Sequence, residues 1–257
     1  MADTNATPRR SLVVLPDLVT SFGLMCGCVS IASALDARFE ISATMIGISL
    51  ACDICDGLVA RASRTASPFG LEYDSLSDVV AFGVAPAILV YAWALKSLGI
   101  LGVAVIGIFV ICAALRLARF NVQTGSSAGK TRFVGLPVPG AAVTIAGLLF
   151  GYRYFGLDSP RTLCVVMALA TLMLAGLMVS RLPYPAMKSV DFPAKKFKIG
   201  TALLIFAALL LIAPSLTALI ASMIYLISGP VLALSGEQVG QAPAQAQPPS
   251  RTGGSVA

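Results

Sequence analysis

Histidine is absent from this sequence, and charged residues are scarce, at 12% of 257 positions. Only one tryptophan is present, and the mean hydropathy is +0.89. This composition lies outside the usual range for soluble domains and predicts a polytopic membrane protein that forms one helical bundle. The net charge of +6 fits basic residues that border apolar spans and contact anionic membrane lipids, so we expect no nucleic-acid partner.

The missing histidine also limits what the six cysteines can do. Cys52 and Cys55 have the spacing of a metal or redox pair. A structural zinc site takes four ligands, however, and neither histidine nor a second close cysteine pair supplies the others. We therefore interpret this pair as small apolar residues that pack between helices.

Long apolar stretches dominate what is present. Eight of them are each near the roughly 20 residues that cross the hydrocarbon layer, and they cover residues 18–35, 41–60, 76–94, 98–117, 139–154, 163–180, 199–213 and 215–234. Only Pro214 separates the last two, which could form a single bent hairpin. We predict an all-α fold, a polytopic membrane helical bundle of about eight transmembrane helices, with six to eight allowed.

The basic residues predict how the bundle is oriented. With the N-terminus in the cytoplasm, all but four of the 18 lysines and arginines fall on the cytoplasmic side, as the positive-inside rule requires. The four on the outer side are Arg38, Lys96, Arg153 and Arg161. We expect an integral protein of a bacterial inner membrane, with both termini facing the cytoplasm.

Two aspartates interrupt the second apolar stretch, although the chain has only 12 acidic residues. At about 100° per residue, Asp53 and Asp56 lie on one face of a helix. The same face carries Gly57, Ala60 and Arg61. The glycine and the alanine have almost no side chain, so they leave open space beside the two carboxylates.

Two more aspartates follow on the next helical segment. Gly70, Asp74 and Asp78 recur every four residues and share one face. Ser67 and Pro68 mark a short turn between this helix and the one before it. The four carboxylates can therefore point into one cavity at the cytoplasmic edge of the bundle.

Such a cavity requires a cation, because unneutralised carboxylates in a membrane cost a few kcal/mol each. Oxygen ligands without histidine or thiolate partners suit Mg²⁺, Mn²⁺ or Ca²⁺ better than zinc. A divalent ion next to an open slot indicates a diphosphate or nucleotide substrate. Two alternatives remain: an ion-pair network with arginines, namely Arg61, Arg64, Arg116 and Arg119, or an ion or proton transporter, although transporters more often space such groups along a route.

The pattern Asp53-x-x-Asp56-Gly57-x-x-Ala60-Arg61-(x8)-Gly70-x-x-x-Asp74-x-x-x-Asp78 resembles, at all eight fixed positions, the signature of the CDP-alcohol phosphotransferase family. The resemblance implies transfer of a substituted phosphoryl group from a CDP-linked donor to an alcohol, with release of CMP, in a homodimeric helical bundle. It also implies a site with two Mg²⁺ or Mn²⁺ ions.

Residue roles follow from the same resemblance. Asp53, Asp56 and Asp74 would be metal ligands, and Asp78 would be the general base and also near the second metal. The implied contacts to the nucleotide are Gly57, Ala60, Arg61, Gly70, Asp17 and Thr20. The chemistry agrees, since metals can stabilise the leaving CMP while a free carboxylate takes the proton from the attacking hydroxyl.

Three further stretches, "LVVLPDLVTSFGLMCGCVSIASA", "ALRLARFNV" and "FVGLPVPGAA", resemble the phosphatidylserine synthase branch of this family, and the resemblance covers roughly residues 12–180. It implies CDP-diacylglycerol and L-serine as substrates. A phosphatidylglycerophosphate synthase is the alternative within the family. One departure is Asp17, where the branch pattern has asparagine, and the added negative charge would alter metal affinity.

Basic residues are candidates to bind the acceptor. Arg116 and Arg119 could hold the serine carboxylate bidentately, with Asn121 to orient it. The alternatives are that both arginines anchor their helix at the interface or hold a lipid phosphate. Lys130 and Arg132 are weaker candidates for the same contacts.

The expected domains are a cytoplasmic N-terminal segment at residues 1–14, a transmembrane catalytic domain at 15–235 and a disordered tail at 236–257. The tail is rich in Gln, Pro, Ala and Gly, with almost nothing to bury.

Overall fold

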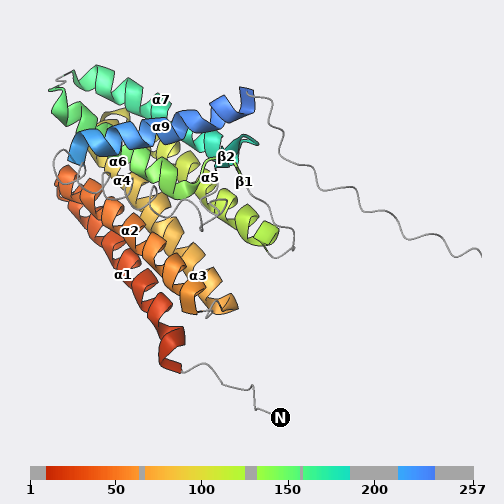
Figure 1. The fold of residues 1–257 in the computed structure, drawn as a ribbon. Coiled ribbons are helices and arrows are strands. Elements are labelled where there is room, and N and C mark those ends of the chain that lie inside the picture. The colour runs from red at the N-terminus through yellow and green to blue at the C-terminus, as the bar shows by residue number, and fades with distance from the viewer. Residues whose placement is uncertain (1–9, 64–66, 125–131, 157–158, 186–213, 235–257) are drawn as a thin grey trace, which may run out of the picture.

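The protein is described here by a computed structural model that covers residues 10–63, 67–124, 132–156, 159–185 and 214–234 (Figure 1). Eight α-helices are described in these ranges: α1 (Arg10–Leu35), α2 (Phe39–Ser63), α3 (Pro68–Asp78), α4 (Ala85–Val90), α5 (Ile100–Thr124), α6 (Val138–Tyr154), α7 (Pro160–Val179) and α9 (Pro214–Leu234). Two short strands, β1 (Arg132–Val134) and β2 (Pro183–Pro185), accompany them.

The chain from Pro68 to Leu98 is one helical rod with two wider, π-helical segments, Val79–Val84 and Tyr91–Leu95, and a final 3₁₀ turn, Lys96–Leu98. Its start is fixed by Ser67, whose Oγ accepts a hydrogen bond from the Gly70 amide at 2.9 Å. The first π-helical segment precedes Pro86, which has no amide proton and crowds the carbonyl one turn earlier. The helix widens directly after Asp78 as a result.

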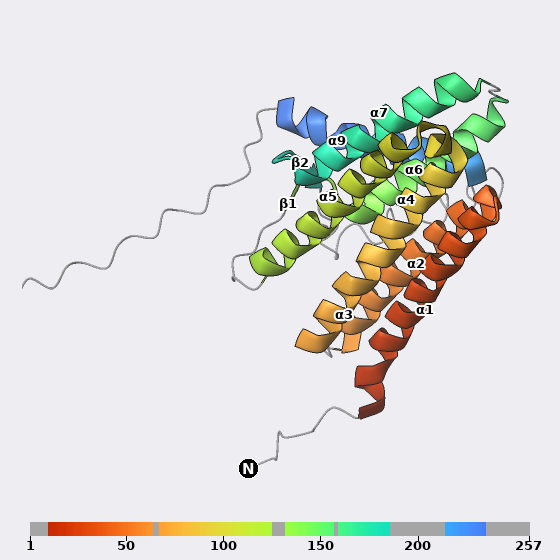
Figure 2. The same ribbon diagram turned by 180° about the vertical axis from the view of Figure 1, so that it is seen from behind.

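Helices α1 and α2 form an antiparallel hairpin, and the rod that begins with α3 lies beside them (Figures 1 and 2). Glycines make the close approach possible. A Cβ on Gly27 would lie 2.9 Å from the Ala81 Cα, and one on Gly23 would lie 3.3 Å from the Cys52 Cβ. The acidic part of α2 is therefore packed directly against α1.

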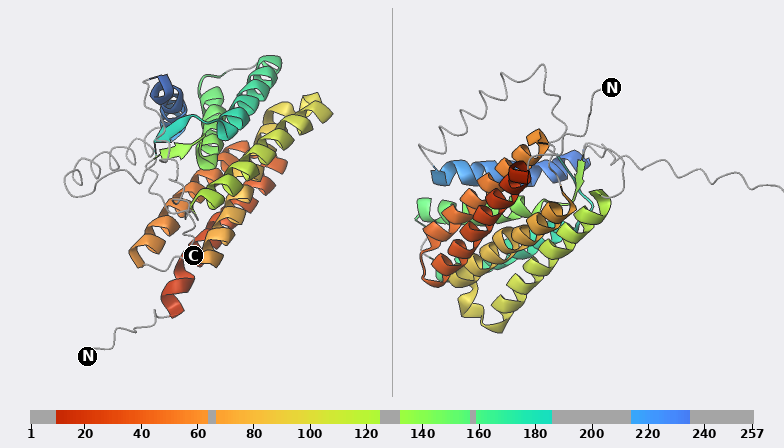
Figure 3. Two further views of the ribbon diagram at one scale, coloured as in Figure 1. Left: turned by 90° about the vertical axis from the view of Figure 1, so that its right-hand side faces the viewer. Right: turned by 90° about the horizontal axis from the view of Figure 1, so that it is seen from below.

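The second half of the bundle packs α5 against α7 and α6 against α9. Helix α9 runs across the long axis of α1 and α2 rather than along it (Figures 1 and 3). The buried core fills the space between the helices with large side chains such as Phe82, Leu89, Phe109, Ile145, Leu149 and Met178.

Four helices are long and apolar enough to cross a membrane, and they cover Asp17–Leu35, Pro68–Leu98, Ile100–Val122 and Pro160–Val179. They indicate a membrane protein. The predicted stretch at 41–60 falls in α2, and the stretches at 139–154 and 215–234 fall in α6 and α9, while 199–213 lies outside the described residues. The count of eight spans therefore stays a prediction, as do the cytoplasmic segment at 1–14, into which α1 extends from Arg10, and the tail at 236–257.

The described residues are mostly helical, as predicted, and include one small sheet besides the helices. Strands β1 and β2 pair antiparallel, with Phe133 opposite Tyr184. Gly135 turns the chain after β1 with φ +82°, and its amide donates to the Leu182 carbonyl at 2.9 Å. Strands of three residues are too short to show an alternating pattern, so the sequence gives no sign of them.

Candidate metal centre

Three of the four predicted carboxylates meet in space. Asp53 and Asp56 come from α2 and Asp74 comes from α3, and one oxygen atom of each lies within 4.8 Å of the other two. Asp56 is buried, and the other two are half-buried. The helical spacing of the two acidic stripes thus predicts which side chains face each other across the turn at Ser67.

Asp78 follows one turn later on α3 and lies outside that group of three oxygens. Its carboxylate is within electrostatic reach of Asp53, Asp74 and Asp56, which repel it. An attractive interaction comes from Arg116 of α5. Asp78 therefore interacts both with the acidic group and with the first arginine of the predicted acceptor site.

Helix α1 supplies a support for one of the clustered carboxylates. The Thr20 hydroxyl, which is 8% exposed, donates a hydrogen bond to the Asp56 Oδ2 at 2.8 Å. This contact fixes the direction of one carboxylate oxygen. In the structure Thr20 contacts a candidate metal ligand, and its expected contact to a nucleotide stays a prediction.

Asp17 lies against the first turn of α3. A Cβ on Gly70 would be 3.3 Å from the Asp17 Oδ1 and 3.1 Å from the Ser67 Oγ, closer than ordinary van der Waals contact. The absence of a side chain at Gly70 lets the carboxylate approach the start of α3. Free amides at a helix N-terminus favour a negative charge, which gives a physical reason for an aspartate at position 17.

Hydroxyl groups tie the neighbouring helices together around the aspartates. The Ser21 and Tyr73 hydroxyls are 2.8 Å apart, which joins α1 to α3. The Asn121 Nδ2 donates to the Ser75 Oγ at 2.9 Å, which joins α5 to α3 beside Asp74. Sequence reasoning missed Ser21, Tyr73 and Ser75.

The two candidate arginines of α5 diverge. Arg116 is buried, with its guanidinium 5.5 Å from the centre of the Phe120 ring, and it interacts with Asp78. Arg119 is exposed, and its Nη1 donates to the Val179 carbonyl at 3.3 Å, at the end of α7. The C-terminus of α7 attracts the second cation, and the expectation that both arginines hold the acceptor carboxylate stays a prediction.

The remaining candidates are less fully described. Gly57 is half-buried and follows Asp56 directly. Ala60 and Arg61 fall in the last turn of α2, and Arg132 falls in β1, but their side chains lie outside what the structure describes, and Lys130 lies outside the described residues altogether.

The donor set fits a hard divalent cation. Three clustered carboxylates repel one another, and a bound cation would remove that cost. Oxygen ligands alone suit Mg²⁺ or Mn²⁺, whereas zinc and copper sites in proteins draw on nitrogen or sulfur. The hydrogen bond from Thr20 holds Asp56 ready for such an ion.

Comparisons with known proteins identify the family of this chain. A profile of the CDP-alcohol phosphatidyltransferase family matches residues 13–176. A CDP-diacylglycerol–serine O-phosphatidyltransferase of Helicobacter pylori is 37% identical over 224 residues, which cover 86% of this chain and 92% of that protein. A protein of the same name from Mycobacterium leprae is 36% identical over 84% of this chain and 73% of its own length.

A third relative carries a different name. The archaetidylserine synthase of Methanothermobacter thermautotrophicus is 36% identical over 177 residues, which cover 68% of this chain and 71% of that protein. The family profile spans more than half of the chain and includes all eight residues of the acidic signature. This chain belongs to the CDP-alcohol phosphatidyltransferase family.

Proposed function

We propose that the protein transfers the phosphatidyl group of CDP-diacylglycerol to the hydroxyl of L-serine and releases CMP. The observation that carries this proposal is the meeting of Asp53, Asp56 and Asp74, with oxygens within 4.8 Å, at the positions of the family signature. The names of the relatives supply the donor and the acceptor.

The acidic group would bind the reactive end of the donor. Asp53, Asp56 and Asp74 would hold Mg²⁺ or Mn²⁺, which would neutralise the diphosphate and stabilise the CMP that leaves. Asp78, one turn further along the same helix as Asp74, would help to hold a second ion. Gly57, which has no side chain, leaves room beside Asp56 for the nucleotide.

Asp78 is the group proposed to move the proton. A serine hydroxyl is a poor nucleophile at neutral pH, so a base must take its proton as the new oxygen–phosphorus bond forms. The bond between phosphorus and the CMP oxygen breaks in the same step. Since Asp78 lies outside the three clustered oxygens, its carboxylate can serve this purpose while the others hold the donor.

We assign the acceptor carboxylate to Arg116 and not to Arg119. Arg116 is buried and interacts with Asp78, so serine bound by its carboxylate at Arg116 would present its hydroxyl near the base. A guanidinium offers two parallel N–H groups to a carboxylate. Arg119 instead stabilises the end of α7.

The decisive experiment supplies purified protein with CDP-diacylglycerol and a panel of alcohols that includes serine and glycerol 3-phosphate. We expect phosphatidylserine and CMP in equal amounts, and no lipid product from the other alcohols. If phosphatidylglycerophosphate were the main product, the acceptor would be glycerol 3-phosphate and not serine. Absence of CMP with every alcohol would reject the transferase and leave transport as the alternative.

We also propose that the acidic centre opens to the cytoplasm and that two copies form a dimer. The distribution of lysine and arginine supports the orientation, and the family resemblance supports the dimer.

A further inference from the structure

A second site lies at the other end of the bundle, where α1 turns into α2. Along α2, Glu40 and Asp56 are 16 positions apart, or about 24 Å at the rise of an α-helix. The hydrocarbon layer of a membrane is about 30 Å thick. The turn and the acidic centre therefore lie toward opposite membrane surfaces.

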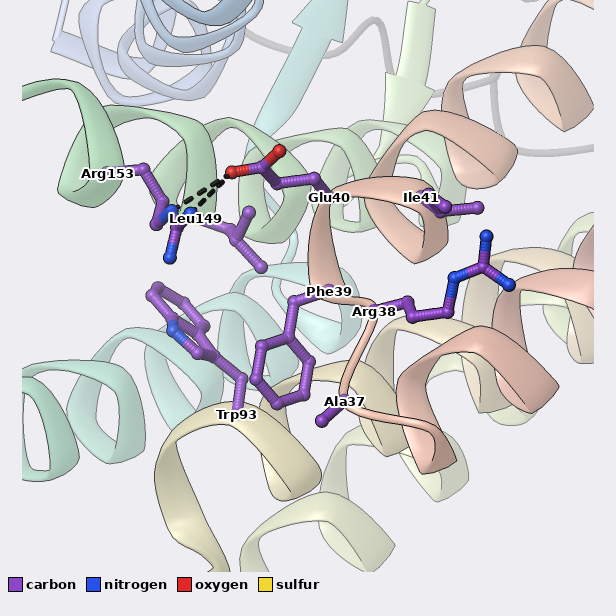
Figure 4. Close-up of a pocket in the computed structure, with 8 residues that line it drawn as sticks. All are labelled: Ala37, Arg38, Phe39, Glu40, Ile41, Trp93, Leu149 and Arg153. Atoms are coloured by element: carbon purple, nitrogen blue, oxygen red, sulfur yellow. Dashed lines mark hydrogen bonds and ion pairs between the residues drawn. The ribbon is translucent and has the colours of Figure 1, made fainter.

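A cavity of about 300 Å³ opens at this turn (Figure 4). Residues 37–41 form one wall, and Trp93, Leu149 and Arg153 form the other. The walls come from the α1–α2 turn with the start of α2, from the second π-helical segment and from α6, which are far apart in sequence. Nothing in the proposed transfer reaction uses this cavity.

The charges that line the cavity favour an anion. Arg153 donates from Nε and Nη2 to the Glu40 Oε1, at 3.0 and 2.9 Å, so these two residues balance each other. A guanidinium has five N–H groups, and this pairing leaves others to donate. Arg38 adds a positive charge to the lining, and this residue is exposed. The lining carries a net charge of about +1.

The uncharged part of the lining favours an amphiphile over a free anion. Trp93, Phe39 and Leu149 supply an apolar wall on the side of Arg153 (Figure 4). The Trp93 ring also meets Tyr152 edge-on, with centroids 5.5 Å apart. Tryptophan and tyrosine gather at the level of lipid headgroups, where an apolar ring body and a polar edge are both accommodated.

Lipid has direct access to this end of the molecule. Leu35 at the end of α1 is 70% exposed and Ile100 at the start of α5 is 79% exposed. Both are large apolar side chains at the ends of helices that are apolar enough to span a membrane. Phospholipid headgroups are thus the phosphate source nearest to Arg38 and Arg153.

We propose that this cavity binds an anionic phospholipid of the leaflet at the α1–α2 end. Arg153 donates to the headgroup phosphate, and the start of an acyl chain packs on Trp93 and Phe39. Arg38, whose guanidinium extends to the other side of the start of α2 (Figure 4), adds attraction for the anionic headgroup. The bound lipid joins the α1–α2 turn to α6 at a site separate from the acidic centre.

Trp93 makes the test direct, because it is the single tryptophan of the chain and lines the cavity. The full-length protein in detergent is titrated with phosphatidylglycerol that is brominated near the glycerol end of its acyl chains, and separately with phosphatidylcholine brominated at the same carbons. Bromine quenches only nearby tryptophan. We expect half-maximal quenching of Trp93 by phosphatidylglycerol at a lipid fraction at least fivefold lower than the fraction of phosphatidylcholine that gives the same quenching.

The variant Arg38→Gln removes the unbalanced charge and keeps the Arg153–Glu40 pair, and it should reduce that fivefold preference to less than twofold. Arg161→Gln removes one exposed charge of α7 outside the cavity and should keep the preference. Release of CMP by both variants, at the wild-type rate, checks that they are folded.

Three outcomes would overturn the proposal. Equal quenching of the wild-type protein by the two lipids would show no selection of the headgroup, and this comparison needs no variant. An equal loss in Arg161→Gln would reduce the effect to general surface charge. Complete reversal of the quenching by millimolar inorganic phosphate would make a free anion, and not a lipid, the ligand.

Discussion

The hydrogen bond from Thr20 to Asp56 gives the sharpest test of the metal centre. The variant Thr20→Val replaces the hydroxyl by a methyl group of nearly the same shape. It removes the donor that holds the Asp56 Oδ2 at 2.8 Å. The buried position of Thr20 means that water cannot easily replace the lost group.

The size of the effect follows from the charge on the acceptor. A hydrogen bond to a charged group contributes about 1.5–3 kcal/mol, and about 1.4 kcal/mol corresponds to a factor of ten. Groups that orient metal ligands typically change metal affinity by about 10- to 100-fold. We therefore expect the half-saturating Mg²⁺ concentration to rise by about 10- to 100-fold.

The assay is CMP release from CDP-diacylglycerol and serine, measured over a range of Mg²⁺ concentrations. Turnover at saturating Mg²⁺ should recover most of its wild-type value, because Thr20 touches a ligand and not the reacting atoms. Thr20→Ser retains the hydroxyl and should stay within a fewfold of the wild type.

Thr44→Val is the matched control. The Thr44 hydroxyl donates to the Glu40 carbonyl on the exposed side of α2, so this change is chemically the same but remote from Asp56. An unchanged Mg²⁺ requirement in Thr20→Val, or an equal change in Thr44→Val, would refute the idea that Thr20 positions a metal ligand.

Three further predictions concern the reaction itself. Chelation with EDTA should abolish CMP release, and Mg²⁺ or Mn²⁺ should restore it; full turnover in excess EDTA would reject the metal. Asp78→Asn should lower turnover by about 100-fold or more while the affinity for CDP-diacylglycerol, measured by equilibrium binding, stays close to wild type; near-normal turnover would remove Asp78 as the base. Arg116→Lys keeps the charge but loses the planar pair of donors, so the KM for serine should rise about tenfold. Arg119→Lys should leave the KM for serine unchanged. A rise in the KM for CDP-diacylglycerol in Arg116→Lys would indicate that Arg116 holds the lipid phosphate.

The sequence predicts the acidic centre well because helix periodicity is a local property. Asp53 and Asp56 share a face of α2 whatever packs against it, and the short turn at Ser67 leaves few ways to place α3. The meeting of Asp53, Asp56 and Asp74 follows from these two facts. Packing between distant helices carries no such local sign, which explains why the contact of Asn121 with Ser75 was not predicted.

The arginines of α5 show the same limit. Arg116 and Arg119 are three residues apart, so a helix places them about 60° apart on its surface. That separation permits convergence on one ligand as well as divergence to two neighbours. The position of α7, whose last carbonyl accepts from Arg119, decides between them, and this position depends on the packing of the whole bundle.

Helix α1 explains how the acidic helices keep their arrangement. Asp17, Thr20 and Ser21 are spaced i, i+3 and i+4, so they form one polar stripe on an otherwise apolar helix. The first lies against Gly70 of α3, the second donates to Asp56 of α2, and the third meets Tyr73 of α3. A single face of α1 thus contacts both helices that carry the candidate metal ligands. Because these contacts join α2 and α3 through a third helix, the spacing of the carboxylates depends on α1 as much as on the turn at Ser67.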